Sequence, residues 1–376
     1  MFHSPQLQAW CVTGYDDIAA ILRNDDDFSA RDHKPRPLTD LPPDVQEMLS
    51  TWSGESVSLG EMDPPEHTRV RSVINAGFTP RALKAAEADI RAAAAQLLEP
   101  LTCVSEFDLI TEFALPYALT VILRFLGIPD AHHQACLRWS DHKVQLMVGR
   151  DHTPEQLREY ATGLRAFGEF ARELTAQRLS APRADLISTM LYESSHGHKL
   201  TPDEVAALIP TLIITGHTTL AQALAIIVRS QLRSPGGWPT LVDGTVPISD
   251  LVEESLRLDC PVVGMYRTTV REVAVAGSVL PAGSRVLLLY GAGNHDPDRY
   301  PGPDRCLPGR WPAPPHLAFG RGTHYCVGAS LARTELRIAL EELAARFPTL
   351  SATPEATPLY RPTFPLRALT ALRVRP

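Results

Sequence analysis

Apolar residues recur at helical spacing through six long segments of this 376-residue chain. Each segment is bounded by Pro, Gly or a cluster of polar residues, which commonly mark helix ends. The spacing predicts helices over residues 82–98, 112–126, 155–179, 203–232, 249–258 and 328–346. Helix therefore dominates the predicted structure.

Strands are predicted for short segments only. Val273 and Val275, then Val279, then residues 286–290 form a β pattern around the turn at residues 281–283. A first strand is expected near Trp10, and a second sheet is predicted near residues 353–372. The expected class is mainly α with small β-sheets, an α+β arrangement.

One predicted helix is long enough to cross a bilayer. Residues 205–228 contain no Asp, Glu, Lys or Arg over 24 positions. Polar or helix-breaking residues nevertheless interrupt the segment, at Pro210, Thr211, Thr215, Gly216, His217, Thr218, Thr219 and Gln222. Because lipid tolerates few such groups, we expect a helix buried in a soluble core and no membrane partner.

Composition narrows the function classes. The net charge is −7 and the 36 basic residues are scattered, so nothing favours a nucleic-acid partner. Six widely spaced cysteines without a CxxC pair suit a reducing cytoplasm, and the amino terminus lacks a signal-peptide profile. No linker, repeat or low-complexity block divides the chain, which predicts a single domain over residues 1–376.

The most specific motif lies close to the last predicted helix, in the run Phe319-Gly320-Arg321-Gly322-Thr323-His324-Tyr325-Cys326-Val327-Gly328. Gly320 and Gly322 allow positive φ and close approach of the backbone to a flat ligand. Backbone N–H groups in such a turn lower the pKa of a thiol and stabilise its thiolate. A Gly-rich turn with a buried cysteine is the plain alternative. Half a zinc site is another, although no further ligand follows at short spacing.

This loop resembles the haem-binding signature of the cytochrome P450 monooxygenases, and other segments match that family in order. Residues 10–31 resemble its first strand and helix, and residues 63–71 resemble the start of its C helix. Glu254 and Arg257 are similar to its ExxR motif, with Arg305 as a candidate third member. Residues 303–306 match only partly, because Cys306 stands where the family has Phe.

The resemblance implies a P450 fold, a helical domain plus a minor β region around a buried haem. Cys326 would be the proximal iron ligand and the metal site. Phe319, Gly320 and Gly328 would contact the haem. His324 and Arg267 match partners of the haem propionates.

The predicted C helix supplies two further propionate partners. Asp63 is expected to cap this helix, with Pro64 at its first position. His67 and Arg71 then lie four residues apart on one helical face, where two donors can bind a pair of carboxylates. The resemblance implies that these carboxylates belong to the haem.

The oxygen-activating helix departs from the family pattern. The family has an acid before a threonine, whereas Gly216 is followed here by His217, Thr218 and Thr219. Thr219 matches the oxygen-facing threonine and Thr218 replaces the acid. A threonine hydroxyl can bend a helix by bonding a carbonyl one turn back. Protons would have to come from water, His217 or the substrate.

The resemblance implies an enzyme with haem b (iron protoporphyrin IX) and O₂. Its electrons would come from NAD(P)H through a separate ferredoxin and ferredoxin reductase. Hydroxylation of an apolar small molecule in bacterial secondary metabolism is the expected reaction. Oxidative C–C or C–O coupling is an alternative that the missing acid keeps open. A haem-based sensor would need an output domain, and a peroxide-driven enzyme would favour an acid or arginine over the iron.

By resemblance, substrate-lining residues come from several parts of the chain. They are residues 34–60, Met147, Leu212, Ile213, Val262, Val263, Met265 and Phe364. Their mainly apolar character predicts a hydrophobic small molecule, which the sequence does not identify further.

Overall fold

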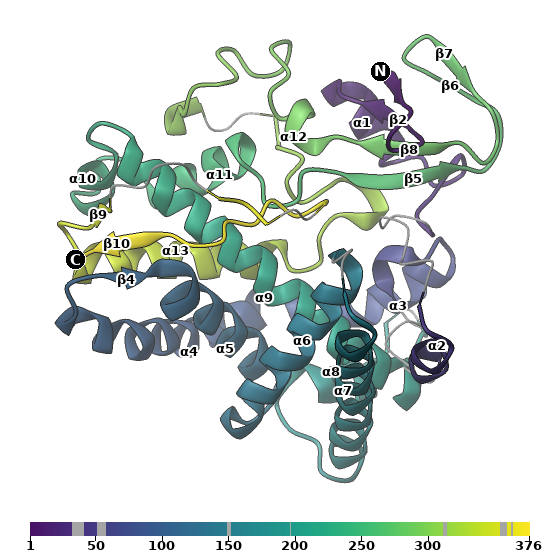
Figure 1. Ribbon diagram of the computed structural model, residues 1–376, viewed down its shortest axis with the longest axis horizontal. Helices are drawn as coiled ribbons and strands as arrows, with labels where there is room; N and C mark the ends of the chain where they lie inside the picture. The colour runs from purple at the N-terminus through teal and green to yellow at the C-terminus, as the bar shows by residue number, and fades with distance from the viewer. Residues whose placement is uncertain are drawn as a thin grey trace. The chain divides into compact units, whose positions relative to one another are not determined.

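The computed structural model describes residues 1–31, 41–50, 58–148, 152–195, 197–310, 314–353, 359–361 and 364–376. These residues form two compact units (Figure 1). The first unit comprises Met1–Ser29, Leu83–Ala118 and Thr218–Pro376, and the second comprises Ala30–Ala82 and Leu119–His217. The predicted class is confirmed: helices predominate and the sheets are small.

The main sheet of the first unit has five strands in the order β1-β2-β8-β5-β3. Their bounds are β1 Phe2–Ser4, β2 Ala9–Val12, β3 Phe28–Ser29, β5 Met265–Thr269 and β8 Arg285–Leu288. β2 pairs in parallel with β8, with Trp10 opposite Val286, and β5 pairs antiparallel with β8, with Met265 opposite Leu288. The start of the chain is thereby joined to residues more than 250 positions later.

Two smaller sheets complete the β structure of the first unit. The hairpin of β6 (Val273–Val275) and β7 (Ser278–Leu280) extends beyond the end of the main sheet in Figure 1. A three-stranded sheet has the order β4-β10-β9, formed by Phe107–Asp108, Arg373–Arg375 and Ser351–Ala352. The predicted strands near 273–288 are confirmed, but the last of them ends at Leu288 and Tyr290 is helical. The strand at β5 was not predicted.

The helices of the first unit include α1 Tyr15–Ile21, α10 Gly237–Val242, α11 Ile248–Leu258, α12 Tyr290–Gly293 and α13 Ala329–Arg346, together with α4 Pro80–Leu98 from Leu83 onward. α11 and α10 pack against α13, and α1 packs against α12. α5 (Leu115–Leu126) follows a π-helical turn at Leu109–Ala114, and α9 spans Pro202–Arg233. The predicted helices all exist, with ends within a few residues of those expected.

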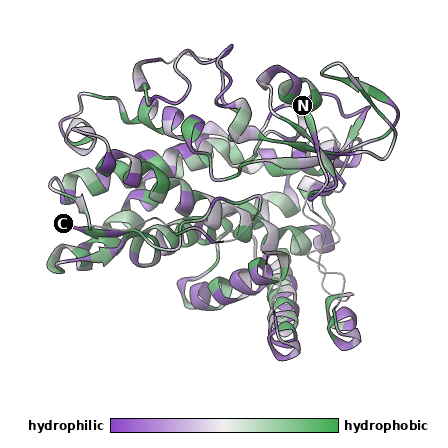
Figure 2. Cartoon of the chain, turned by 45° about the horizontal axis from the view of Figure 1, so that its top comes forward, coloured by the Kyte–Doolittle hydropathy of each residue, from purple (hydrophilic) through white to green (hydrophobic). Residues whose placement is uncertain are grey.

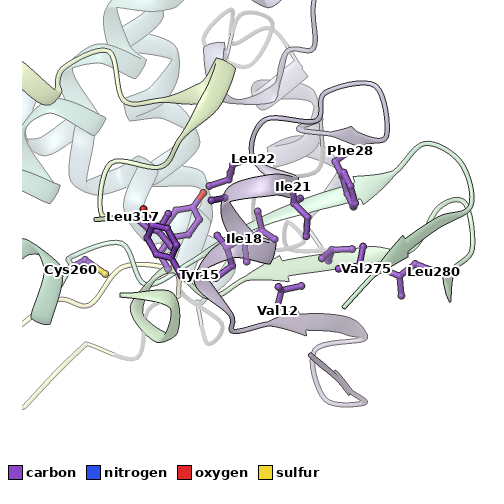
Figure 3. Packing of buried hydrophobic residues seen from close by; sticks show 14 of the residues in the cluster. Val12, Tyr15, Ile18, Ile21, Leu22, Phe28, Cys260, Val275, Leu280 and Leu317 are labelled. Atoms are coloured by element: carbon purple, nitrogen blue, oxygen red, sulfur yellow. The ribbon is translucent and has the colours of Figure 1, made fainter. Parts of the chain in front are cut away.

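One hydrophobic cluster of the first unit surrounds α1. Ile18 and Ile21 of this helix, and Leu22 directly after it, pack with Val12 of β2, with strand residues from β3, β6, β7 and β8, and with Leu317. Figure 3 shows these side chains gathered around α1, with Leu317 at one end and Leu280 at the other. Burying each large aliphatic side chain contributes about 1.5–3 kcal/mol.

The second unit is helical. The α-helices that lie wholly within it are α2 Pro43–Ser50, α3 Glu66–Asn75, α6 His133–Val148, α7 Pro154–Ser180 and α8 Leu186–Tyr192, and parts of α5 and α9 belong to it as well. α7 starts with a capping box, in which Thr153 and Gln156 satisfy each other's backbone N–H groups. α7 packs against α2, α6 and α8. Most helices in Figure 2 carry green and purple stretches on the same ribbon, as expected for helices with one buried face.

Two helical stretches of the described chain are long and apolar enough to span a bilayer. They are Leu109–Leu126 and Pro202–Arg233, and their most apolar windows are 61% and 67% buried within the protein. Such burial is typical of core helices in soluble proteins, as the sequence predicted for α9.

Candidate functional site

The cysteine loop of the first unit adopts the turn that its glycines predict. Gly320 and Gly322 have φ of +68° and +65°, in the left-handed region. The backbone N–H of Cys326 donates to the carbonyl of Phe319 at 2.9 Å, and that of Tyr325 donates to Gly322 at 3.0 Å. The loop therefore closes on itself and presents Cys326, whose side chain is exposed.

Gly328 acts differently from the other two glycines. Its φ is −85°, which any residue can adopt, and it immediately precedes α13. A Cβ added there would lie 4.0 Å from Cys326 Sγ, with no other heavy atom among the described residues that close. Glycine at this position leaves open space beside the sulfur, as a thiolate that ligates the iron of a flat macrocycle requires. The loop thus fits a haem.

Arg267 provides a buried positive charge in the same unit. It lies on β5, is 4% exposed, and donates from Nη1 to the carbonyl of Tyr266 at 2.8 Å. Among the described residues no carboxylate forms an ion pair with it. A buried guanidinium with one backbone acceptor fits an additional anion, such as a propionate. His324, half-buried in the short helix Gly322–His324, belongs to this unit as well.

Tyr290 is a neighbour of the loop that sequence reasoning missed. Its hydroxyl lies 3.9 Å from the position of a Cβ at Gly320. Burial raises the pKa of Tyr290 and the nearby Arg267 opposes that shift, so the phenol stays neutral. Tyr290 begins α12 directly after β8, and no pattern in the sequence marks it.

The ExxR pair is confirmed as a buried ion pair, but its third member is corrected. Arg257 donates to both carboxylate oxygens of Glu254, at 2.9 and 3.0 Å, and both side chains are fully buried. Arg310 Nε also donates to Glu254, at 2.9 Å. Arg305, the predicted third member, offers only its carbonyl to Arg257, because its own side chain is exposed.

Another ion pair supports the start of the loop. The buried His316 lies 3.4 Å from Glu253, which also pairs with Arg333 of α13. These partners lower the pKa of Glu253 to about 2, against the opposing effect of burial. The Arg333 guanidinium lies 4.6 Å from the centre of the Phe319 ring. Phe319, predicted to contact haem, is thereby fixed by a cation–π contact.

α3 of the second unit carries His67 and Arg71, as predicted. His67 is fully buried and Arg71 is half-buried. The predicted cap is wrong, because the helix begins at Glu66 and Asp63 lies outside it. The Asp63 carboxylate instead accepts from the backbone of Ala30 at 2.8 Å and pairs with Arg31 at 3.3 Å.

α9 carries the predicted oxygen-activating residues. A Cβ at Gly216 would lie 2.8 Å from Ile122, so glycine permits close packing there. The hydroxyl of Thr215, one turn before Thr219, donates to the carbonyl of Thr211 at 2.7 Å. Thr218 and Thr219 are both half-buried. Their predicted roles in oxygen activation stay predictions.

His217 forms a hydrogen bond with the Ile213 carbonyl at 2.7 Å through Nδ1. Since a carbonyl only accepts, Nδ1 carries the proton. Burial lowers the pKa of His217, so the ring is neutral at pH 7 and its Nε2 has no proton to give. This finding weakens His217 as the proton source that the sequence allowed.

The predicted substrate-lining residues divide between the units. In the first unit, the backbone N–H of Val263 donates to the carbonyl of Pro365 at 2.9 Å. Val262 and Val263 therefore lie beside the segment that contains Phe364. Phe364 packs on Tyr266, on the face of β5 opposite to Met265. Leu212 and Ile213 are buried in the α9 portion of the second unit. The side chain of Met147 and most of residues 34–60 lie outside the described residues, and the lining remains a prediction.

Known proteins resemble this chain along nearly its whole length. Residues 248–368 match the family described as Cytochrome P450. The erythromycin C-12 hydroxylase of Saccharopolyspora erythraea is 33% identical over 343 residues, covering 91% of this chain and 83% of that enzyme. The biotin biosynthesis cytochrome P450 of Bacillus subtilis is 32% identical over 365 residues, covering 97% and 89%.

Solved structures agree with these relatives. The crystal structure of P450BioI, in complex with hexadec-9Z-enoic acid ligated acyl carrier protein, superposes with a TM-score of 0.86. It is 31% identical and covers 98% of this chain and 92% of that chain. Together with the loop of Cys326 and the buried Glu254–Arg257 pair, these likenesses place the chain in the cytochrome P450 family, as a haem monooxygenase that oxidises small molecules.

Proposed function

We propose that this P450 hydroxylates an apolar small molecule, with Cys326 as the proximal ligand of haem b. The observation that carries the proposal is the loop of Cys326, which holds an exposed sulfur beside the open space at Gly328. A haem bound there would supply O₂ activation, favoured by electron donation from the thiolate. The apolar character of Val262, Val263 and Met265 supports a hydrophobic substrate.

The remaining site residues have binding and positioning roles. Arg267 and His324 bind propionates, as do His67 and Arg71 of α3. The buried guanidinium of Arg267 supports this role most directly, because a desolvated cation needs an anionic partner. The Thr219 hydroxyl would order a water that delivers protons within the site.

Electrons reach this enzyme from NAD(P)H through a ferredoxin and a ferredoxin reductase in the cytoplasm. Six free cysteines, three of them buried, support a reducing compartment. Reconstitution with a ferredoxin and its reductase, compared with peroxide alone, tests the electron source. Product formed only with peroxide would overturn this part of the proposal.

Cys326→Ser tests the ligand assignment. The reduced, carbon monoxide-bound enzyme should lose its red-shifted absorption band, because a serine oxygen donates less electron density than a thiolate. Cys306→Ser is the control, since burial raises the pKa of Cys306 and keeps it a neutral thiol. If Cys326→Ser keeps the band and Cys306→Ser loses it, the assignment is wrong.

Oxidative C–C or C–O coupling is a second candidate, favoured by one observation. Thr218 occupies the position of the family's acid and cannot ionise to relay protons. A reaction in which the substrate supplies its own protons, such as the coupling of two phenols, suits this change. A compound library screened by substrate-induced difference spectra, followed by product analysis, distinguishes coupling from hydroxylation.

A further inference from the structure

The cysteine loop is joined at three points to α1 and the residues that follow it. The Arg321 Nη2 donates to the Tyr15 hydroxyl at 2.7 Å. The Thr323 hydroxyl forms a hydrogen bond with the Asp25 carboxylate. A Cβ at Gly322 would lie 2.0 Å from the carbonyl oxygen of Leu22, so the two backbones are in close contact. All of these residues belong to the first unit.

Tyr15 is itself held firmly. It is 5% exposed, its hydroxyl donates to the Pro315 carbonyl at 2.6 Å, and its backbone N–H donates to Asp296 at 2.8 Å. Its ring meets Tyr300 edge to face at 5.9 Å, and the buried Arg257 lies 5.1 Å from the centre of the Tyr300 ring. A continuous set of contacts therefore runs from the ExxR arginine to the loop.

The segment that enters the loop packs on the same helix. Leu317, fully buried, belongs to the cluster formed by Tyr15, Ile18 and Leu22 (Figure 3). The backbone N–H of Leu317 donates to the Asn294 side chain at 2.7 Å. Between Leu317 and the start of α13, two left-handed glycines leave the loop with much conformational freedom in isolation. External contacts must restrict that freedom.

We propose that Tyr15 and Asp25 are positioning residues for the iron ligand, acting through Arg321 and Thr323 on the loop that carries Cys326. Thr323 is three residues before Cys326 and Arg321 is five before it, so each contact fixes the backbone leading to the sulfur. This inference rests on the proposed role of Cys326. A ligand functions only when its supporting contacts hold it within a fraction of an ångström.

The test measures how fast the holoenzyme loses thiolate ligation. Reduced, carbon monoxide-bound protein is warmed mildly, at a temperature where far-ultraviolet circular dichroism is unchanged, and the decay of the red-shifted band is followed. Thr323→Val and Asp25→Ala should each accelerate the decay about tenfold, equivalent to about 1.4 kcal/mol. Thr323→Ser, which keeps the hydroxyl, should restore the wild-type rate, and Tyr15→Phe should accelerate the decay similarly.

Two controls make the test specific. Asp17→Asn is matched, because Asp17 also lies in the first turn of α1, where its carboxylate faces Gly14. Its decay rate should equal that of the wild type. The double variant Thr323→Val/Asp25→Ala should decay no faster than either single variant, because the two substitutions remove the same hydrogen bond.

Wild-type decay rates in Thr323→Val, Asp25→Ala and Tyr15→Phe would overturn the proposal, as would equal acceleration in Asp17→Asn. Additive effects in the double variant would show that Asp25 does not act through Thr323. A failure of the ligand assignment is recognised separately, since Cys326→Ser would then retain the band.

Discussion

Arg310→Ala should destabilise the protein far more than Arg305→Ala, although the two arginines are only five residues apart. Arg310 is the third member of the buried cluster, with its side chain 9% exposed and its Nε 2.9 Å from Glu254. The Arg305 side chain is exposed and only its carbonyl, which any residue has, joins the cluster. The two substitutions therefore separate the side-chain role from that of the backbone.

The contacts set the size of the effect. A hydrogen bond to a charged group contributes about 1.5–3 kcal/mol when its partner would be left buried. Glu254 would keep its two bonds from Arg257 and one from the backbone of Leu307 at 2.9 Å. We expect Arg310→Ala to cost about 2–3 kcal/mol, and Arg257→Ala about 3–5 kcal/mol because it leaves a buried carboxylate without its main partner. Arg305→Ala should change stability by less than about 0.5 kcal/mol.

Urea unfolding followed by circular dichroism, with haem content measured by absorbance, provides the comparison. Arg310→Lys should recover part of the loss, because it restores a charge but not the planar geometry of arginine. Equal losses in Arg305→Ala and Arg310→Ala would refute the assignment of Arg310. So would an unchanged urea midpoint in Arg310→Ala.

Three further predictions concern haem binding, proton delivery and pH dependence. Arg267→Ala should lower haem content by removing a charge-assisted bond of about 1.5–3 kcal/mol, whereas the exposed Arg271→Ala should retain full content on pyridine haemochrome assay. Thr219→Ala should bind substrate normally but divert electrons to hydrogen peroxide. Thr218→Glu should change the amount of product formed per reductant consumed. If this ratio is unaltered in Thr219→Ala, its hydroxyl does not take part in proton delivery. Burial raises the pKa of Glu335, so its contribution to stability is full below the ordinary glutamate pKa and is lost as pH rises toward the folded value. Glu335→Gln should therefore flatten the decline of the urea midpoint as pH rises above the ordinary glutamate pKa. An unchanged slope would contradict this assignment.

The sequence predicted the long helices well because their patterns extend over several turns. α4, α7, α9 and α13 each repeat an apolar face often enough to outweigh local exceptions. β5 was missed because its five residues include Arg267 and two threonines, without an alternating pattern. Its neighbours in the sheet, β3 and β8, are fixed by pairings distant in sequence, which local patterns do not encode.

The candidate site shows the same division between local and distant effects. The left-handed glycines of the cysteine loop were predictable, because few residues permit that turn. The cap at Asp63 and the choice of Arg305 were wrong for a shared reason: each was made from sequence spacing alone. The Asp63 carboxylate instead contacts the backbone of Ala30 and the side chain of Arg31. The chain after β8 folds so that Arg310 reaches Glu254.

Proton supply is a point where this chain departs from the family pattern, and the structure narrows the possible proton sources. Thr218 has no acidic proton, and the Nδ1 proton of the neutral His217 is bound to the Ile213 carbonyl. The hydroxyl of Thr215, on the same helix, donates a hydrogen bond to the carbonyl of Thr211. Of the sources that the sequence allowed, water and the substrate remain, and Thr219 is the side chain proposed to order either. Coupling of electron use to product should therefore depend more on the functional groups of the substrate than in a P450 with an acid at this position.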